Sequence, residues 1–470
     1  MEPYEIQEYI KSRSLGSAEA APEEKTLYEF PDLCSRIKAA FFKEWEKEEN
    51  PKSILDIQKK AIIGYEKESS YFKDRIGDLL RRMGACDTPY PPWYAGLTEG
   101  IYQENWGLAG ISEWFTEEYA HSSSAKIIGE RIYFLREGRM VLQPQKISAT
   151  RKEQLIRAFL LLNPEERLDK TYHETYLLDG TRVTIYAEPM AKKGQSSIVF
   201  RRYIVPILSF EEQSRRRTIP AEAIPLLHQM VRIGFSVVFL GAVRTAKTTF
   251  LTTWQSYEDP SLEGVMVETD PEIPLHQILP QAPILQLLAD GQELSRISKS
   301  LLRSDADYFI LAEARDGIAL NTAVKIAGKG TKRLKLTFHS GDPDQFPLEA
   351  AEEIVQATGG DLPMTMRRVA SGFDYLLHFI QLNDKREKRL KSIREMSCGE
   401  DGKISISPIC EYDILSDSWT FYDRIGTKKR LFALSSDPNA FREMQRLLQD
   451  LAGASPIPNA PAAEGKETRR

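Results

Sequence analysis

The sequence predicts an α/β protein in which a doubly wound, mostly parallel sheet is preceded by a smaller α+β domain and a helical segment. Three observations lead to this fold class. Apolar residues recur at helical spacing near the N-terminus, strand and hairpin patterns follow, and apolar strands alternate with helical stretches after residue 223. Because 470 residues exceed the size of one ordinary hydrophobic core, we expect several domains.

The helical segment covers residues 1–95. Over 23–49 and 54–83, apolar side chains recur every three or four positions among many charged ones, as on an amphipathic helix. The Pro-Tyr-Pro-Pro stretch at 89–92 ends this pattern, because proline interrupts helical hydrogen bonding.

The α+β domain covers residues 96–205. Within it, 131–135 has the composition of a strand followed by a Glu-Gly turn, and 177–186 has that of a hairpin with Asp-Gly at its tip. Residues 206–222, which hold charged side chains between prolines, are expected to form a linker.

The doubly wound domain covers residues 223–452. It opens with a helix that we expect to stop at Gly234, a favourable C-cap residue, and the apolar strand 236–240 follows at once. Residues 453–470 are rich in alanine, proline, glycine and charge, so we expect a disordered tail.

Composition restricts the function. Hydrophobic residues make up 41% and charged residues 28%, as in soluble globular proteins, and the net charge of −5 argues against a nucleic-acid binder. The acidic N-terminus lacks a signal-peptide core, and no apolar run approaches the ~18 residues of a membrane span, so we expect a cytoplasmic protein that reaches membranes through partners. The four cysteines show no metal-type spacing and are expected to be reduced.

Residues 241–249 form a nucleotide-binding P-loop pattern in which Ala246 replaces the second glycine. An apolar strand precedes the loop and a helical stretch follows it, which is the context in which backbone N–H groups bind phosphate at a helix N-terminus. Lys247 would neutralise the β- and γ-phosphates of a nucleotide, and the Thr248 hydroxyl would help to hold Mg²⁺. The predicted phosphate-binding residues are Gly241, Thr245, Ala246, Lys247, Thr248 and Thr249.

Polar residues follow three later strands. Glu313 ends the apolar run 308–312, Glu268 and Glu272 follow the run 265–267, and His339 ends an alternating strand. Ligands of open α/β sheets bind at the carboxyl ends of the strands, so these side chains are expected to converge on the phosphates. Each one alone has a simpler interpretation, such as a solvated strand end or a structural histidine.

With these residues in place, the sequence resembles the secretion ATPases of type II and type IV secretion systems and pili, and most of all the CpaF-like ATPases of Tad/Flp pili. The resemblance covers about residues 100–435. Beyond the P-loop, it rests on the segments Val267–Ile273, Leu302–Asp307, Ala312–Arg315 and Thr337–His339, and, in the α+β domain, on Asp179–Arg182 and Val199–Tyr203.

The resemblance implies a RecA-like ATPase domain and assigns roles to individual residues. Glu313 would be the Walker B acid that helps to hold Mg²⁺ through water, Arg315 belongs to the same motif, and Glu268 and Glu272 would position metal or water. His339 would sense the γ-phosphate. Arg182 and Arg201 (or Arg202) would reach the nucleotide from the α+β domain, unless they are ordinary surface arginines.

Several positions depart from the family pattern. Alanine replaces glycine at Ala246 and Ala312, and Thr269 stands where the family has aspartate. The Gly-Lys-Gly-Thr-Lys-Arg run at 328–333 is longer than expected. If the loop requires a left-handed backbone at Ala246, the cost is ~1–2 kcal/mol. A cost of this size predicts that nucleotide binding is weakened and turnover slowed, and that neither is abolished.

The first hypothesis is therefore an ATP- and Mg²⁺-dependent motor, hexameric as the resemblance implies, that drives a membrane platform in secretion or pilus assembly. The alternative is a non-hydrolysing paralogue that serves as an assembly scaffold, favoured by the departures at Ala246 and Ala312. A RecA-like nucleic-acid translocase is a third reading, disfavoured by the acidic balance of the chain.

Overall fold

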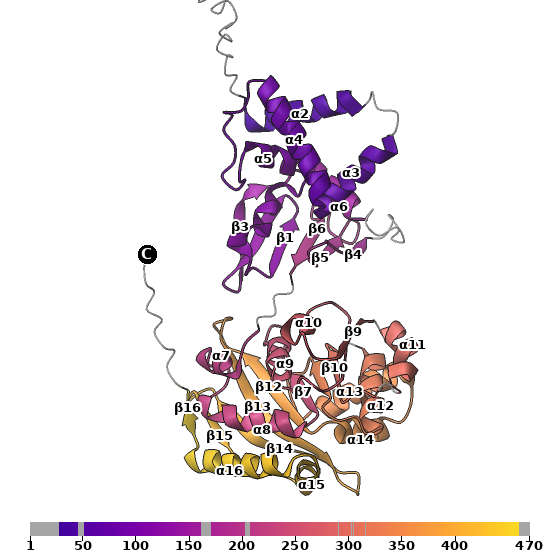
Figure 1. Ribbon diagram of the computed structural model, residues 1–470, viewed down its shortest axis with the longest axis vertical. Coiled ribbons are helices and arrows are strands. Elements are labelled where there is room, and N and C mark those ends of the chain that lie inside the picture. The colour runs from indigo at the N-terminus through magenta and orange to yellow at the C-terminus, as the bar shows by residue number, and fades with distance from the viewer. Residues whose placement is uncertain are drawn as a thin grey trace, which may run out of the picture. The chain divides into compact units, whose positions relative to one another are not determined.

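The computed structural model describes residues 28–45, 51–160, 171–202, 207–289, 291–301, 303, 305–314 and 316–459. The chain divides into two compact units, with the boundary between Arg202 and Tyr203 (Figure 1). No helix among the described residues is long and apolar enough to cross a membrane. All four cysteines are free thiols, as expected, and three of them are buried.

The first unit begins with helices that pack around an aromatic core. These helices are α2 (Phe30–Trp45), α3 (Pro51–Ile63), α4 (Glu66–Arg82) and α5 (Leu97–Asn105). The rings of Phe72 and Trp106 stack with their centroids 5.0 Å apart, and Phe41 packs beside them. The single helical pattern over 54–83 is in fact two helices, because Gly64 takes a φ of 101° that an ordinary helix cannot contain.

A six-stranded antiparallel sheet completes the first unit, with the order β3-β2-β1-β6-β5-β4. Its strands are β1 (Ser124–Ile128), β2 (Arg131–Arg136), β3 (Arg139–Lys146), β4 (Tyr172–Tyr176), β5 (Arg182–Tyr186) and β6 (Ser197–Arg201), and its helices are η1 (Ala109–Phe115), η2 (Glu117–Tyr119) and α6 (Ala149–Leu160). The predicted hairpin is confirmed: β4 and β5 pair antiparallel, and the Asp179 carboxylate accepts a hydrogen bond from the N–H of Thr181 in the turn.

The second unit is built on a ten-stranded sheet with the order β16-β15-β14-β13-β12-β7-β11-β10-β8-β9. Its strands are β7 (Val237–Leu240), β8 (Gly264–Glu268), β9 (Ile284–Leu288), β10 (Tyr308–Ala312), β11 (Lys335–Phe338), β12 (Tyr375–Gln381), β13 (Lys388–Cys398), β14 (Ile404–Asp413), β15 (Ser418–Phe421) and β16 (Ile457–Pro458). Strands β9, β8, β10, β11, β7 and β12 are parallel, and antiparallel strands extend the sheet beyond β12.

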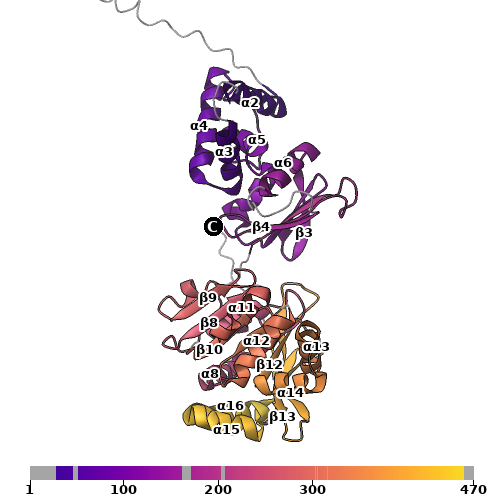
Figure 2. The ribbon, with the colours of Figure 1, turned by 90° about the vertical axis from the view of Figure 1, so that its right-hand side faces the viewer.

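Helices cover both faces of the parallel strands, which confirms the doubly wound fold. The helices of this unit are α7 (Phe210–Arg215), η3 (Ala221–Ala223), α8 (Ile224–Ile233), α9 (Lys247–Gln255), α10 (Leu275–Ile278), α11 (Gly291–Leu301), α12 (Gly317–Gly328), α13 (Phe346–Thr358), α14 (Leu362–Gly372), α15 (Thr427–Ser436) and α16 (Pro438–Ala454). In Figures 1 and 2, α8 and α16 lie side by side, and α12, α13 and α14 form a separate layer.

Strand β7 shows why the parallel strands, which helices cover on both faces, are apolar throughout. Val237 and Phe239 pack into the core that includes α8, α9 and α16, whereas Val238 and Leu240 pack into the core that includes α12, α13 and α14. Because successive side chains of a strand point to opposite faces, a strand covered on both faces needs an unbroken apolar run.

The domain ends differ from the pattern-based expectation. Residues 206–222 contain helix α7, whose Phe210 is fully buried in the second unit, as is Ile219. Helix α8 ends as expected at Gly234, which is left-handed. In the segment 453–470, α16 continues to Ala454 and β16 pairs with β15, while residues 460–470 lie outside the described part of the chain.

Candidate active site

The carboxyl ends of neighbouring parallel strands bring the predicted residues together. Strand β7 leads into the P-loop, β10 into Glu313 and β8 ends at Glu268, while β11 lies between β7 and β10 and delivers His339. Ala312 of β10 pairs with Glu268, and Phe338 of β11 pairs with Leu240. The histidine therefore emerges between the P-loop and Glu313.

Gly241 is the first residue of the loop, and any larger residue at this position would clash with its neighbours. Its φ of 145° lies in the region open to glycine, and a Cβ there would lie 2.3 Å from the carbonyl oxygen of Phe379 and 2.6 Å from Thr245 Oγ1. The Thr245 hydroxyl in turn donates to the Ala242 carbonyl at 2.9 Å. The strand β12 that carries Phe379 thus limits how far the loop can expand.

Ala246 adopts the left-handed conformation that the motif normally assigns to glycine. Its φ and ψ are 73° and 24°, and it is the residue that precedes the first turn of α9. Its carbonyl already accepts the first helical hydrogen bond, from the N–H of Phe250 at 2.9 Å. An L-residue in this conformation costs about 1–2 kcal/mol of folding free energy.

Lys247 is buried, and all three of its ammonium protons have partners. Nζ donates to the carbonyls of Gly241 and Ala242, both at 2.9 Å, and lies 3.1 Å from His339 Nδ1. Burial lowers the Lys247 pKa to about 8, and the nearby carboxylates of Glu313 and Glu272 oppose this shift. A phosphate oxygen would have to replace one of these acceptors, because an ammonium group has only three donors.

His339 connects Lys247 to Glu313. Because an ammonium group can only donate, Nδ1 must accept, which places the imidazole proton on Nε2. Nε2 lies 3.2 Å from Glu313 Oε1 and donates to it. Glu313 itself has a φ of 61°, which is rare for a residue other than glycine and is typical of strained functional positions.

The two acids after β8 occupy different environments. Glu268 is buried, and its Oε1 accepts hydrogen bonds from the backbone N–H groups of Glu272 at 3.2 Å and Ile273 at 3.0 Å. Burial raises the Glu268 pKa to about 8, although these two hydrogen bonds lower it. Glu268 therefore stabilises the turn that contains Glu272. Glu272 is half-buried and lies close enough to Lys247 to raise the Lys247 pKa.

The threonines lie at the start of α9. Thr248 and Thr249 are half-buried in its first turn, and their carbonyls accept from the hydroxyls of Thr252 and Thr253. No cluster of three or more histidine, cysteine or acidic side chains that could hold a metal occurs in the described part of the chain. A Mg²⁺ ion here would thus need phosphate oxygens and water among its ligands, which is usual for this ion.

The three arginines of the first unit that the resemblance singles out, Arg182, Arg201 and Arg202, make different contacts. Arg182 and Arg201 are cross-strand partners in β5 and β6, an arrangement that brings two positive charges onto one face. Arg182 is largely buried, and its Nε lies 3.1 Å from Glu174 Oε1. Arg202 instead stacks on Trp114, at 4.0 Å from the ring centroid, and donates to the carbonyls of Trp114 and Tyr119.

This geometry makes Arg202 a packing residue and leaves Arg201, which is half-buried, as the better candidate of the two for contacting a ligand. Arg315, which the sequence places in the Walker B motif, lies outside the described residues.

Two residues near the site are not among the predicted site residues, although one of them, Thr337, lies in a segment that carries the resemblance. The Thr337 hydroxyl accepts the backbone N–H of Glu313 at 2.7 Å and so supports the strained conformation of that residue. Lys388 lies near Arg244 of the P-loop, and burial together with this second cation lowers the Lys388 pKa to about 8. The sequence alone does not bring Lys388 to the loop, since its position depends on the strand order, in which β12 lies between β13 and β7.

The residues present fit a nucleotide phosphate and Mg²⁺. A loop that begins at Gly241, a buried lysine and the N-terminus of α9 form a site for anionic oxygen, and the carboxylates of Glu313 and Glu272 lie near Lys247. When bound, Mg²⁺ would supply charge neutralisation at the phosphates.

No protein-family model matches the sequence, and neither does any curated protein. The VirB11 ATPase of the Brucella suis type IV secretion system, solved with sulphate, is 15% identical, with 61% of this chain and 92% of that chain covered and a TM-score of 0.33. The Legionella pneumophila ATPase DotB is 15% identical, with 71% and 85% covered and a TM-score of 0.41.

The pilus retraction motor PilT with bound ADP is 11% identical to this chain, with 69% of this chain and 86% of that chain covered and a TM-score of 0.40. Identities and scores in this range do not assign the chain to a family.

Proposed function

We propose that this protein is an ATPase that uses Mg²⁺-ATP to drive a membrane-bound machine of the type II or type IV secretion class, of the CpaF-like (Tad/Flp) kind. The observation that carries the proposal is the chain of contacts from Lys247 through His339 to Glu313 at the carboxyl end of three parallel strands. A phosphate-binding cation is thereby joined to the acid that would order the attacking water.

In this proposal each residue acts through its observed environment. Lys247 exchanges a loop carbonyl for a phosphate oxygen, and His339 responds because its Nδ1 contact to Lys247 changes. That change alters the hydrogen bond from His339 Nε2 to Glu313, which positions the carboxylate for the water. Glu268 holds the backbone of Glu272 near Lys247, where Glu272 would help to position Mg²⁺ or water.

The remaining parts of the proposal rest on the sequence resemblance. Arg182 and Arg201 would stabilise charge on the transferred phosphoryl group, Arg315 would take part in the Walker B motif, and the protein would work as a cytoplasmic homo-oligomer, hexameric in the family it resembles, with inner-membrane platform proteins as partners. The two units, residues 1–202 and 203–470, would move against one another during turnover.

The test is phosphate release by the purified full-length protein with Mg²⁺ and ATP. Glu313→Gln should lower the rate by about 100-fold or more, as loss of a catalytic acid does, while the affinity for ADP stays within about threefold. Glu349→Gln, an acid on α13 that the proposal gives no role, is the matched control and should keep its rate. Equal rates for wild type and Glu313→Gln would refute the proposal.

A scaffold without hydrolysis is the second candidate, favoured by the left-handed alanine at position 246. It predicts that Lys247→Ala leaves secretion or pilus assembly intact in cells. Loss of assembly in a Lys247→Ala strain with a normal protein level would exclude the scaffold.

A further inference from the structure

A pocket of about 630 Å³ lies between helices α12 and α14 of the second unit. Its lining includes the apolar side chains of Val324, Ala327 and Met364, and Met364 is 64% exposed. Basic residues form its rim: Lys325 and Lys329 on the α12 side, and Arg367 and Arg368 on α14. We call this feature the α12–α14 groove. It lies outside the candidate active site and includes part of the basic run at 328–333.

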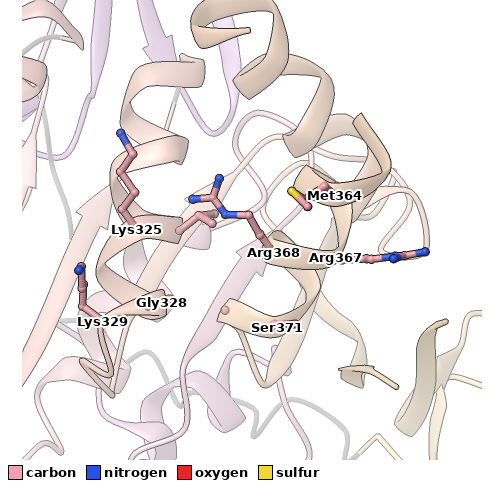
Figure 3. A pocket seen from close by; sticks show the side chains of 10 residues that line it. Lys325, Gly328, Lys329, Met364, Arg367, Arg368 and Ser371 are labelled. Atoms are coloured by element: carbon pink, nitrogen blue, oxygen red, sulfur yellow. The ribbon is translucent and has the colours of Figure 1, made fainter. Parts of the chain in front are cut away.

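The charge of this groove is not balanced locally. No acidic side chain lines it among the described residues, and all four basic side chains are exposed. Figure 3 shows Arg368 reaching from α14 toward α12, with Lys325 and Lys329 along α12, while Arg367 extends away at the outer rim. Cations near a helix C-terminus suit the helix dipole, but the dipole does not require cations from two helices around one pocket.

The arrangement indicates the chemistry of a partner. Lys325 and Lys329 are one helical turn apart, about 6 Å along the axis, so the charges are spread along a groove and do not converge on one point as in a phosphate site. Among the described residues that line the groove, none is aromatic and could stack a nucleobase. A concave surface lined by apolar and basic side chains is complementary to an extended or helical peptide that carries acidic and apolar residues.

We propose that the α12–α14 groove is a docking site for an acidic, apolar-anchored segment of a partner protein. Acidic side chains of the segment would pair with Lys325, Lys329 and Arg368, and an apolar side chain would cover Met364. The proposal is independent of ATP turnover, since none of these residues belongs to the candidate active site.

Fluorescence anisotropy of the full-length protein without nucleotide tests this proposal. The probe is a short fluorescein-labelled peptide that alternates glutamate and leucine. We expect saturable binding that Arg368→Glu weakens by about tenfold or more, because a reversed charge repels the acidic segment. Arg368→Lys should stay within about threefold of wild type, and Lys325→Glu provides a second reversal on the other helix.

The matched control is Arg430→Glu, which reverses an exposed charge on α15 of the same unit and should leave binding unchanged. Equal binding to Arg368→Glu, or equal binding of a lysine–leucine peptide, would overturn the proposal. So would equal binding of a glutamate–serine peptide, because it would show that the apolar lining residues do not contribute to binding.

Two further measurements test whether a membrane or a second copy of this chain occupies the α12–α14 groove. Vesicles of phosphatidylserine that displace the peptide from the wild type, but do not bind Arg368→Glu, would assign the groove to a membrane surface. Dissociation of an oligomer by Arg368→Glu in sedimentation would assign it to a second copy of this chain. Either result would overturn the peptide proposal, and neither depends on whether the protein hydrolyses ATP.

Discussion

Replacing Ala246 by glycine tests whether the P-loop stores backbone strain. Alanine at φ 73° and ψ 24° costs about 1–2 kcal/mol relative to an unstrained residue. Glycine removes that cost but adds about 0.5–1 kcal/mol of unfolded-chain entropy. The difference predicts that Ala246→Gly stabilises the second unit by roughly 0.5–1 kcal/mol, with a melting temperature about 1–4 °C higher.

Differential scanning calorimetry of the full-length protein measures this change. The matched control is Ala357→Gly, an exposed position near the end of helix α13, where the same substitution should destabilise by about 0.5–1 kcal/mol. The control also identifies the transition of the second unit, since it lowers that transition alone. If Ala246→Gly lowers the same transition, the assignment of strain to Ala246 is wrong.

The ADP affinity of Ala246→Gly shows whether alanine at position 246 is tolerated by the nucleotide site or weakens it. If Ala246 is left-handed with and without ligand, the strain cancels from the binding free energy, and the ADP affinity measured by titration calorimetry should change by less than about threefold. A gain of about tenfold or more, equivalent to 1.4 kcal/mol, would show that alanine resists the bound conformation. That result would refute the reasoning above and favour the scaffold.

Three further predictions concern the candidate active site and the first unit. His339→Ala should lower the rate of phosphate release by about 100-fold with little change in ADP affinity, because the link between Lys247 and Glu313 is lost; an unchanged rate would remove His339 from the mechanism. The raised Glu268 pKa means that the folded state favours the protonated carboxyl, so this group stabilises the fold fully below its unfolded pKa and loses that contribution as pH rises toward about 8. Glu268→Gln should therefore stabilise the protein by at least about 1 kcal/mol more at pH 9 than at pH 5, measured by thermal unfolding, and a pH-independent difference would contradict the burial of a titrating carboxyl. Arg202→Ala should lower the melting temperature because the stack on Trp114 is lost, whereas Arg201→Ala should leave it within about 1 °C and lower the catalytic rate; the reverse pattern would exchange their roles.

Much of the fold could be predicted because its signals are local. The apolar strand, the glycine turn and the helix of the P-loop are adjacent in sequence, and so are the β4–β5 hairpin and the C-cap at Gly234. The break at Gly64 and the helix at Phe210 were missed, since the first depends on one dihedral angle and the second on burial against distant elements.

The sequence by itself determined which residues of this protein could perform phosphate chemistry: Lys247, Thr248, Glu268, Glu272, Glu313 and His339 stand at strand ends or at a helix start, where periodicity places them. Only the tertiary structure decided which of them touch. The strand order sets β11 between β7 and β10, so His339 joins Lys247 to Glu313, and it sets β12 beside β7, so Phe379 confines Gly241 and Lys388 approaches the loop. Strand order results from how helices cover both faces of the sheet, which is a property of packing over the whole domain and is not written in any local pattern.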